Sequence, residues 1–85
     1  MFAVNKTTRR ELSIETLFFK TREEAVEDMW SAIFRWSEYC DKEAFEYDAE
    51  RGLCGMDENS AWFDTEGVIN EDTAMITIVE VPALL

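Results

Sequence analysis

Histidine is absent from this chain of 85 residues, and glycine and basic residues are scarce. Without histidine the chain cannot build the Cys-His or Ser-His-Asp arrangements of nucleophilic catalysis, and it lacks the commonest metal ligand. The three glycines, at positions 52, 55 and 67, form no phosphate-binding loop. No run of about 18 apolar residues is present that could cross a bilayer as a helix. These absences exclude many classes of enzyme and predict no membrane-spanning helix.

Carboxylates are abundant, so chemistry based on acidic residues needs separate consideration. The 19 Asp and Glu residues could supply the acid pair of a glycosidase, but their spacing singles out no pair. Asp57, Asn59 and Asp64 suggest a calcium loop, yet its sixth position, where glycine is required, is Trp62. We therefore expect a protein that is not an enzyme and that holds no metal or cofactor.

The N-terminus and the two cysteines bear on the cellular compartment. Residues 1–10 place their basic residues after a very short apolar stretch, which reverses the order of a secretory signal. A cytoplasmic location is therefore expected, where thiols stay reduced. Cys40 and Cys54 could pair across a short loop, but two buried or partly buried thiols are the favoured interpretation.

Charge is divided unevenly along the chain. Residues 1–22 hold five basic and two acidic residues, a net charge of +3, whereas residues 23–85 hold three basic and 17 acidic residues, a net of −14. The chain is nevertheless 47% hydrophobic and 13% aromatic, which is typical of a folded globule and not of a disordered acidic tail. We expect a single domain, residues 1–85, small enough for a homodimer to be a possibility.

Alternation of apolar and polar residues predicts a β-hairpin at the N-terminus. The alternation runs through residues 2–7 and again through residues 12–17, with a polar turn between them. In this interpretation Lys6, Arg9 and Arg10 are charges that keep the hairpin tip soluble.

A helix is predicted over residues 22–40. Residues 21–24 form a capping box, in which Thr21 and Glu24 can each bond a free backbone N–H group. An apolar stripe with spacings of three and four residues follows. Trp30, Phe34 and Trp36 cannot all face one sheet, so we expect at least one of them to flank the core or to be exposed.

The second half of the chain predicts further strands. Residues 45–49 alternate, which fits either a strand with one acidic face or a continuation of the helix. Residues 60–65 and 74–81 are predicted strands, the latter rich in β-branched residues and closed by Pro82. The expected fold is α+β, an antiparallel sheet of four or five strands packed on one amphipathic helix.

This layout resembles a loose group of short acidic proteins encoded by gut bacteria and their phages. The resemblance rests on residues 2–4 opening the hairpin, 21–25 opening the helix, 60–62 in a strand and 78–81 at the close. It spans most of the chain and implies no activity. By size and charge alone, without a shared motif, the chain is also similar to phage-encoded DNA-mimic inhibitors of bacterial defence, the anti-CRISPR and anti-restriction proteins.

The acidic segment 38–72 carries the first functional hypothesis. Twelve acidic residues stand there against Lys42 and Arg51, and such a segment is either a solvated surface or a site that recognises a basic groove. We expect a non-enzymatic protein that engages a basic surface of a protein partner; a nucleic-acid-binding enzyme, toward which the chain would mimic DNA, is one such partner. The proposed partner-binding residues are Glu38, Asp41, Glu43, Glu46, Asp48, Glu50, Asp57 and Glu58, with Trp36 as apolar anchor.

A second hypothesis belongs to a different class. The chain could be a small structural protein that self-associates through its sheet or its spare aromatic face, with its acidity serving solubility alone. Neither hypothesis involves direct binding to nucleic acid or to a membrane, because the net charge of −11 repels both phosphates and anionic lipid.

Overall fold

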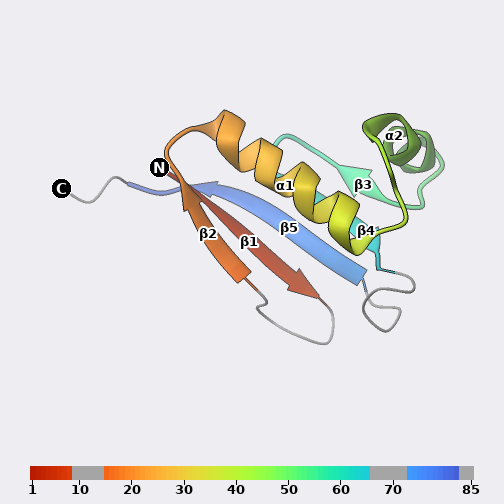
Figure 1. The fold of residues 1–85 in the computed structure, drawn as a ribbon, viewed down its shortest axis with the longest axis horizontal. Coiled ribbons are helices and arrows are strands. Elements are labelled where there is room, and N and C mark those ends of the chain that lie inside the picture. The colour runs from red at the N-terminus through yellow and green to blue at the C-terminus, as the bar shows by residue number, and fades with distance from the viewer. Residues whose placement is uncertain (9–14, 66–72, 83–85) are drawn as a thin grey trace.

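A computed structural model describes residues 1–8, 15–65 and 73–82 as one antiparallel sheet covered on one face by helices (Figure 1). The element order within these residues is β1 (Phe2–Thr8), β2 (Glu15–Phe19), α1 (Arg22–Trp36), α2 (Lys42–Glu50), β3 (Gly55–Met56), β4 (Ser60–Asp64) and β5 (Thr73–Glu80). The strands lie in the order β2-β1-β5-β4-β3. The predicted α+β class and antiparallel sheet are confirmed.

The core lies between α1 and one face of the sheet. Because side chains alternate across a strand, Val4, Ile76 and Ile78 point to the same face, and all three are buried. Ala25, Met29 and Ile33 of α1 pack against that face. In the described part of the chain no helix lies over the opposite face of the sheet.

The N-terminal hairpin forms as predicted. β1 and β2 pair antiparallel, with Phe2 opposite Phe19 and Lys6 opposite Glu15. β1 also pairs antiparallel with β5, which joins the two ends of the chain in the centre of the sheet. Residues 12–14, the predicted start of the second strand, lie outside the described residues.

Helix α1 begins as predicted but ends earlier. The Thr21 hydroxyl accepts a hydrogen bond from the Glu24 backbone N–H at 3.2 Å, which confirms the predicted N-cap. The predicted end at residue 40 is wrong, since the helix stops at Trp36. Ser37 adopts an extended backbone conformation there, and its backbone N–H and hydroxyl both donate to the Ile33 carbonyl. A serine that bonds the preceding turn in this way competes with continuation of the helix.

The ambiguous segment near residue 45 belongs to a separate second helix, so the strand interpretation is wrong, and so is a continuation of the first helix. The Asp41 carboxylate accepts from the Ala44 N–H at 2.8 Å and caps α2. Phe45 is 1% exposed and meets the rings of Trp30 and Tyr39 edge to face, with centroids 5.4 and 5.3 Å apart. α2 is therefore held against α1 by an aromatic cluster.

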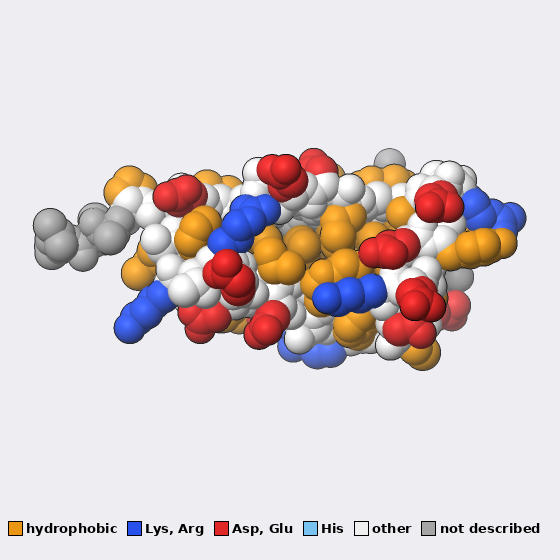
Figure 2. Space-filling model, turned by 90° about the horizontal axis from the view of Figure 1, so that it is seen from above, with side chains coloured by type: hydrophobic (Ala, Val, Ile, Leu, Met, Phe, Trp, Pro, Cys, Tyr) orange, Lys and Arg blue, Asp and Glu red, His pale blue; other side chains and the backbone are white. Residues whose placement is uncertain are grey.

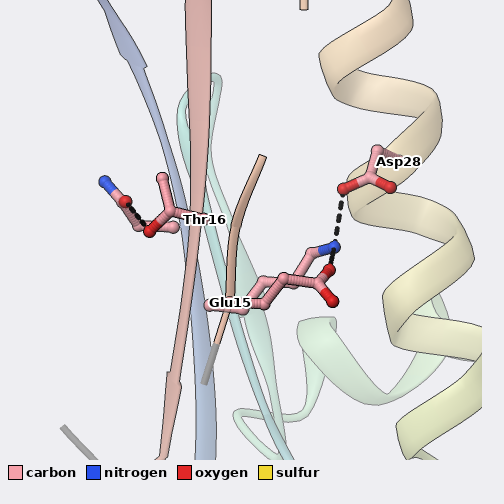
Figure 3. A network of polar contacts seen from close by, with 5 residues as sticks. Glu15, Thr16 and Asp28 are labelled. Carbon is pink, nitrogen blue, oxygen red and sulfur yellow. Dashed lines mark hydrogen bonds and ion pairs between the residues drawn. The ribbon is translucent and has the colours of Figure 1, made fainter. Parts of the chain in front are cut away.

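A buried lysine joins the hairpin to α1 (Figure 3). Lys6 points toward the helix, in phase with Phe2 and Val4, and is 0% exposed. Its Nζ lies 2.6 Å from Glu15 Oε1 and 2.7 Å from Asp28 Oδ2. The prediction that Lys6 serves a soluble hairpin tip is wrong, because the alternation of β1 carries it to the core face; positions 9 and 10 lie outside the described residues.

Removing both carboxylates from Lys6 should destabilise the fold. The double variant Glu15→Gln with Asp28→Asn leaves a buried ammonium without an ionic partner, and we expect the free energy of unfolding in urea to fall by about 3–5 kcal/mol. Glu27→Gln, beside Asp28 in sequence but exposed, is the control and should change it by less than about 0.5 kcal/mol. Equal stability of the two variants would refute the role given to the ion pairs.

The Glu15 contribution should depend on pH. The hydrogen bond from Lys6 lowers the pKa of Glu15 below its ordinary value of 4.5. Because the folded-state pKa is depressed, the contribution is complete above the unfolded pKa and is lost as pH falls through the folded one. The difference in unfolding free energy between the native chain and Glu15→Gln should therefore be constant near neutrality and shrink on acidification below about 4.5. A difference that stays the same at acid pH would contradict this.

Candidate functional site

Six of the eight predicted acidic binding residues lie at one end of the molecule. We call this group the acidic end; it comprises Glu38, Asp41, Glu43, Glu46, Asp48 and Glu50. It is built on α2 and on the connection that leads into it from α1, and all of its members except the half-buried Asp48 are exposed. The capped helix thus fixes the spacing of a set of carboxylates on a short surface element.

The other two predicted residues are placed elsewhere. Asp57 and Glu58 lie in the turn between β3 and β4, next to the start of α1, where Arg22 donates to Asn59 Oδ1 at 2.7 Å and to the Glu58 carbonyl. The acidic end follows the other end of α1, a helix of 15 residues and about 22 Å in length. The predicted set is therefore divided into two groups. The backbone N–H of Asn59 bonds Asp57 and lowers the pKa of that carboxyl.

Cations stand among the carboxylates. Figure 2 shows Lys and Arg side chains interleaved with Asp and Glu around a central apolar area of the helical face. Lys42 Nζ lies 5.2 Å from the centre of the Trp30 ring, and the Arg51 guanidinium lies 5.3 Å from that of Tyr47. These cations rest on aromatic rings, a favourable placement, so they reduce the local field without occupying the carboxylates.

A small pocket opens at the acidic end. It has a volume of about 210 Å³ and is lined by Glu38, Tyr39, Asp48, Leu53 and Asp64. Three of these five residues are carboxylates and none is basic. The Tyr39 hydroxyl donates to Asp48 Oδ2 at 2.8 Å and so orients that carboxylate. Burial, with help from Cys54 and Asp48, raises the pKa of Tyr39, so the phenol remains a donor at neutral pH. Such a pocket suits a basic side chain.

Trp36, the predicted apolar anchor, is only partly exposed. It packs against the core, and the Arg35 guanidinium lies 5.7 Å from its ring centre. Trp30 and Phe34 stack on each other with centroids 5.6 Å apart, beside α2. The exposed aromatic of the acidic end is Tyr47, on α2.

A second surface is the face of the sheet turned away from α1; the second hypothesis from the sequence named the sheet as a surface for self-association, but not this face or its residues. We call it the open face; among the described residues it comprises Ala3, Asn5, Thr7, Thr16, Phe18, Gly55, Ser60, Trp62, Asp64, Thr73, Met75, Thr77 and Val79. Asp64 alone in this set is charged, and its Oδ1 accepts from the Thr73 hydroxyl at 3.1 Å. The period-two pattern that predicted the strands contained this face, but did not say which face the helix would cover.

Neither a family model, nor a curated protein, nor a solved structure matches this chain. Among the described residues, no helix is long and apolar enough to cross a membrane, and no group of three or more Cys, Asp or Glu side chains is arranged to hold a metal ion.

The two cysteines should differ sharply in reactivity. Both are free thiols in the structure. The expected burial is confirmed for Cys54, where it raises the pKa of the thiol, and is wrong for Cys40, which is exposed. With a thiol-reactive disulfide reagent at mildly alkaline pH, we expect one fast equivalent of reaction in the native protein and a second after denaturation. Cys40→Ser should abolish the fast phase and Cys54→Ser should leave it unchanged; two fast equivalents in the native protein would disprove the burial of Cys54.

Proposed function

We propose that this chain is a non-enzymatic, cytoplasmic binding protein whose acidic end engages a basic surface of a protein partner. The observation that carries the proposal is the pocket lined by Glu38, Asp48 and Asp64, with Tyr39 holding one carboxylate in place. A lysine or arginine of the partner would enter this pocket, where charge-assisted hydrogen bonds favour it. The surrounding exposed carboxylates would steer the encounter.

A nucleic-acid-binding enzyme is the partner class that we propose. α2 has nine residues and is about 13 Å long, a length over which duplex DNA carries about eight phosphates. The acidic end presents six carboxylates on and beside this helix, with Lys42 and Arg51 among them. A site shaped to bind phosphates could accept such an array, and the chain would then act as a DNA mimic that obstructs the enzyme, as a phage inhibitor of bacterial defence does.

Charge neutralisation at the two ends tests the location of binding. The variant Glu43→Gln, Glu46→Gln, Asp48→Asn changes the acidic end, whereas Glu23→Gln, Glu27→Gln, Glu58→Gln makes the same change in net charge near the start of α1. We expect the first variant to weaken binding of a fluorescent lysine- and arginine-rich peptide by about tenfold or more, and the second by much less. Fluorescence anisotropy measures both affinities.

Salt and competition complete this test. Native affinity should fall steeply between about 50 and 200 mM salt, because screening weakens attraction between exposed charges. For a captured nucleic-acid-binding enzyme, duplex DNA should displace the chain. The proposal would be contradicted if the two variants lost peptide affinity equally, or if the native affinity did not change with salt.

A further inference from the structure

We propose that the open face is the docking surface for a second copy of this chain, so that two sheets pack face to face in a symmetric homodimer. This inference is argued from the apolar side chains of the open face and does not use the acidic end; Asp64, at the end of β4, is the one residue of the open face that also lines the pocket of the acidic end. It assigns a role to exposed apolar side chains that the proposed function leaves unused.

The open face exposes large apolar side chains at adjacent positions of the sheet. Phe18 is 61% exposed and lies in register with Ala3 and Val79 across three neighbouring strands. Met75 is 50% exposed and pairs with Trp62, which is 39% exposed. Exposed apolar side chains gathered on one face are typical of interaction sites.

Between these two apolar rows the open face is small and polar. Thr16, Asn5, Thr77 and Ser60 lie in one row across four strands. The Thr16 hydroxyl donates to Asn5 Oδ1 at 2.8 Å, so part of this polarity is satisfied within the face itself (Figure 3). A neutral row with internal hydrogen bonds can be covered at a lower desolvation cost than a charged row.

Gly55 allows the Trp62 indole to lie close to the backbone of β3. A Cβ atom at position 55 would come within 2.2 Å of Trp62 Nε1, a distance that real Cβ atoms do not show. The indole therefore lies over the backbone of β3 and widens the surface beyond β4. A level surface of this kind suits the packing of one sheet on another, about 10 Å apart.

Charge favours a copy of the chain over a basic partner as the occupant. A basic partner is attracted to carboxylates, yet the open face carries Asp64 as its single charge among the described residues, at the end of β4. Two copies of net charge −11 repel each other at most orientations. Face-to-face docking of the two open faces brings neutral rows together and directs both acidic ends away from the contact.

The area is large enough for a weak, specific dimer. Five strands at about 4.8 Å spacing, most of them five to eight residues long, give roughly 450 Å² of flat area per copy. A pair would bury about 900 Å² by this flat measure, just below the value of about 1,000 Å² for a stable interface and within the range of weak, transient contacts. We therefore expect a dissociation constant in the micromolar range, set by the apolar rows.

Sedimentation of matched charge variants tests the dimer. The native chain should change from a mass of 9.9 kDa to twice that mass as its concentration rises through the micromolar range. Met75→Glu places a carboxylate within the open face and should raise the dissociation constant more than about tenfold. Leu53→Glu is the control, since Leu53 is 53% exposed, similar to Met75, but lies at the pocket of the acidic end; it should leave dimerisation unchanged.

Two further measurements make the outcome decisive. Circular dichroism checks that each variant folds, and Thr77→Glu, in the central polar row, replaces Met75→Glu if the latter does not. Salt should strengthen the dimer by screening repulsion, whereas it weakens binding of a basic partner, so failure of one proposal is distinguishable from failure of the other. A chain that stays monomeric up to millimolar concentration at high salt, or a dimer disrupted equally by Leu53→Glu, would overturn the inference.

Discussion

The packing of α1 on the sheet is the contact on which the rest of the structure depends. The helix is too narrow to cover all five strands of the sheet. An α-helix with side chains is about 10–12 Å wide, whereas five strands span about 24 Å. α1 contacts β1, β2 and β5, so it covers the middle of the sheet and one edge. The other edge, β4 and β3, needs a second cover. That constraint accounts for α2, which contacts β3 and buries Phe45 against Trp30.

At the β2 edge, the sheet and α1 are joined by the ion pairs of the buried Lys6. The side chain of Lys6 lies below α1, where a shorter apolar residue would leave space between the helix and the edge strand. Its long aliphatic stem fills the volume, and its ammonium draws Glu15 and Asp28 together from two elements. Removing the carboxylates destabilises the fold because the fully buried Lys6 ammonium would be left without an ionic partner. The two sides of the sheet are thus covered by different means, ion pairs at the β2 edge and an aromatic cluster at the side of β4 and β3.

Local signals in the sequence predicted the elements whose termini are capped or whose pattern is strict. Thr21 and Glu24 identified the start of α1, and the β-branched run in 74–81 identified β5. The end of α1 was missed because Ser37 is a weak stop signal until its hydroxyl is seen to bond Ile33. α2 was ambiguous because nine residues contain too few turns to separate period 3.6 from period 2, although Asp41 was an available cap.

The candidate sites were less predictable, since they depend on which elements meet. The spacing of carboxylates along 38–58 could not show that Arg22 holds residues 58 and 59 at the start of α1, whereas the acidic end follows the last residue of that helix. Lys6 shared the phase of Val4, which was a signal of burial, but an isolated lysine in a strand usually faces water.

The two proposed surfaces depend on different interactions, electrostatic attraction at the acidic end and apolar contact at the open face, so both fit in one small chain. The acidic end gains from a low-salt encounter with positive charge, while the open face gains from apolar contact once repulsion is screened. Carboxylates in the middle of the open face, in addition to Asp64 at the end of β4, would oppose face-to-face contact, and a large apolar area at the acidic end would weaken electrostatic steering. The sheet separates the two surfaces. One face packs on α1 and forms the core, so the other face is the one available for a neutral contact. In these proposals the dimer contact is the face of the sheet that the helices leave uncovered, and the partner contact is the acidic end beside α2.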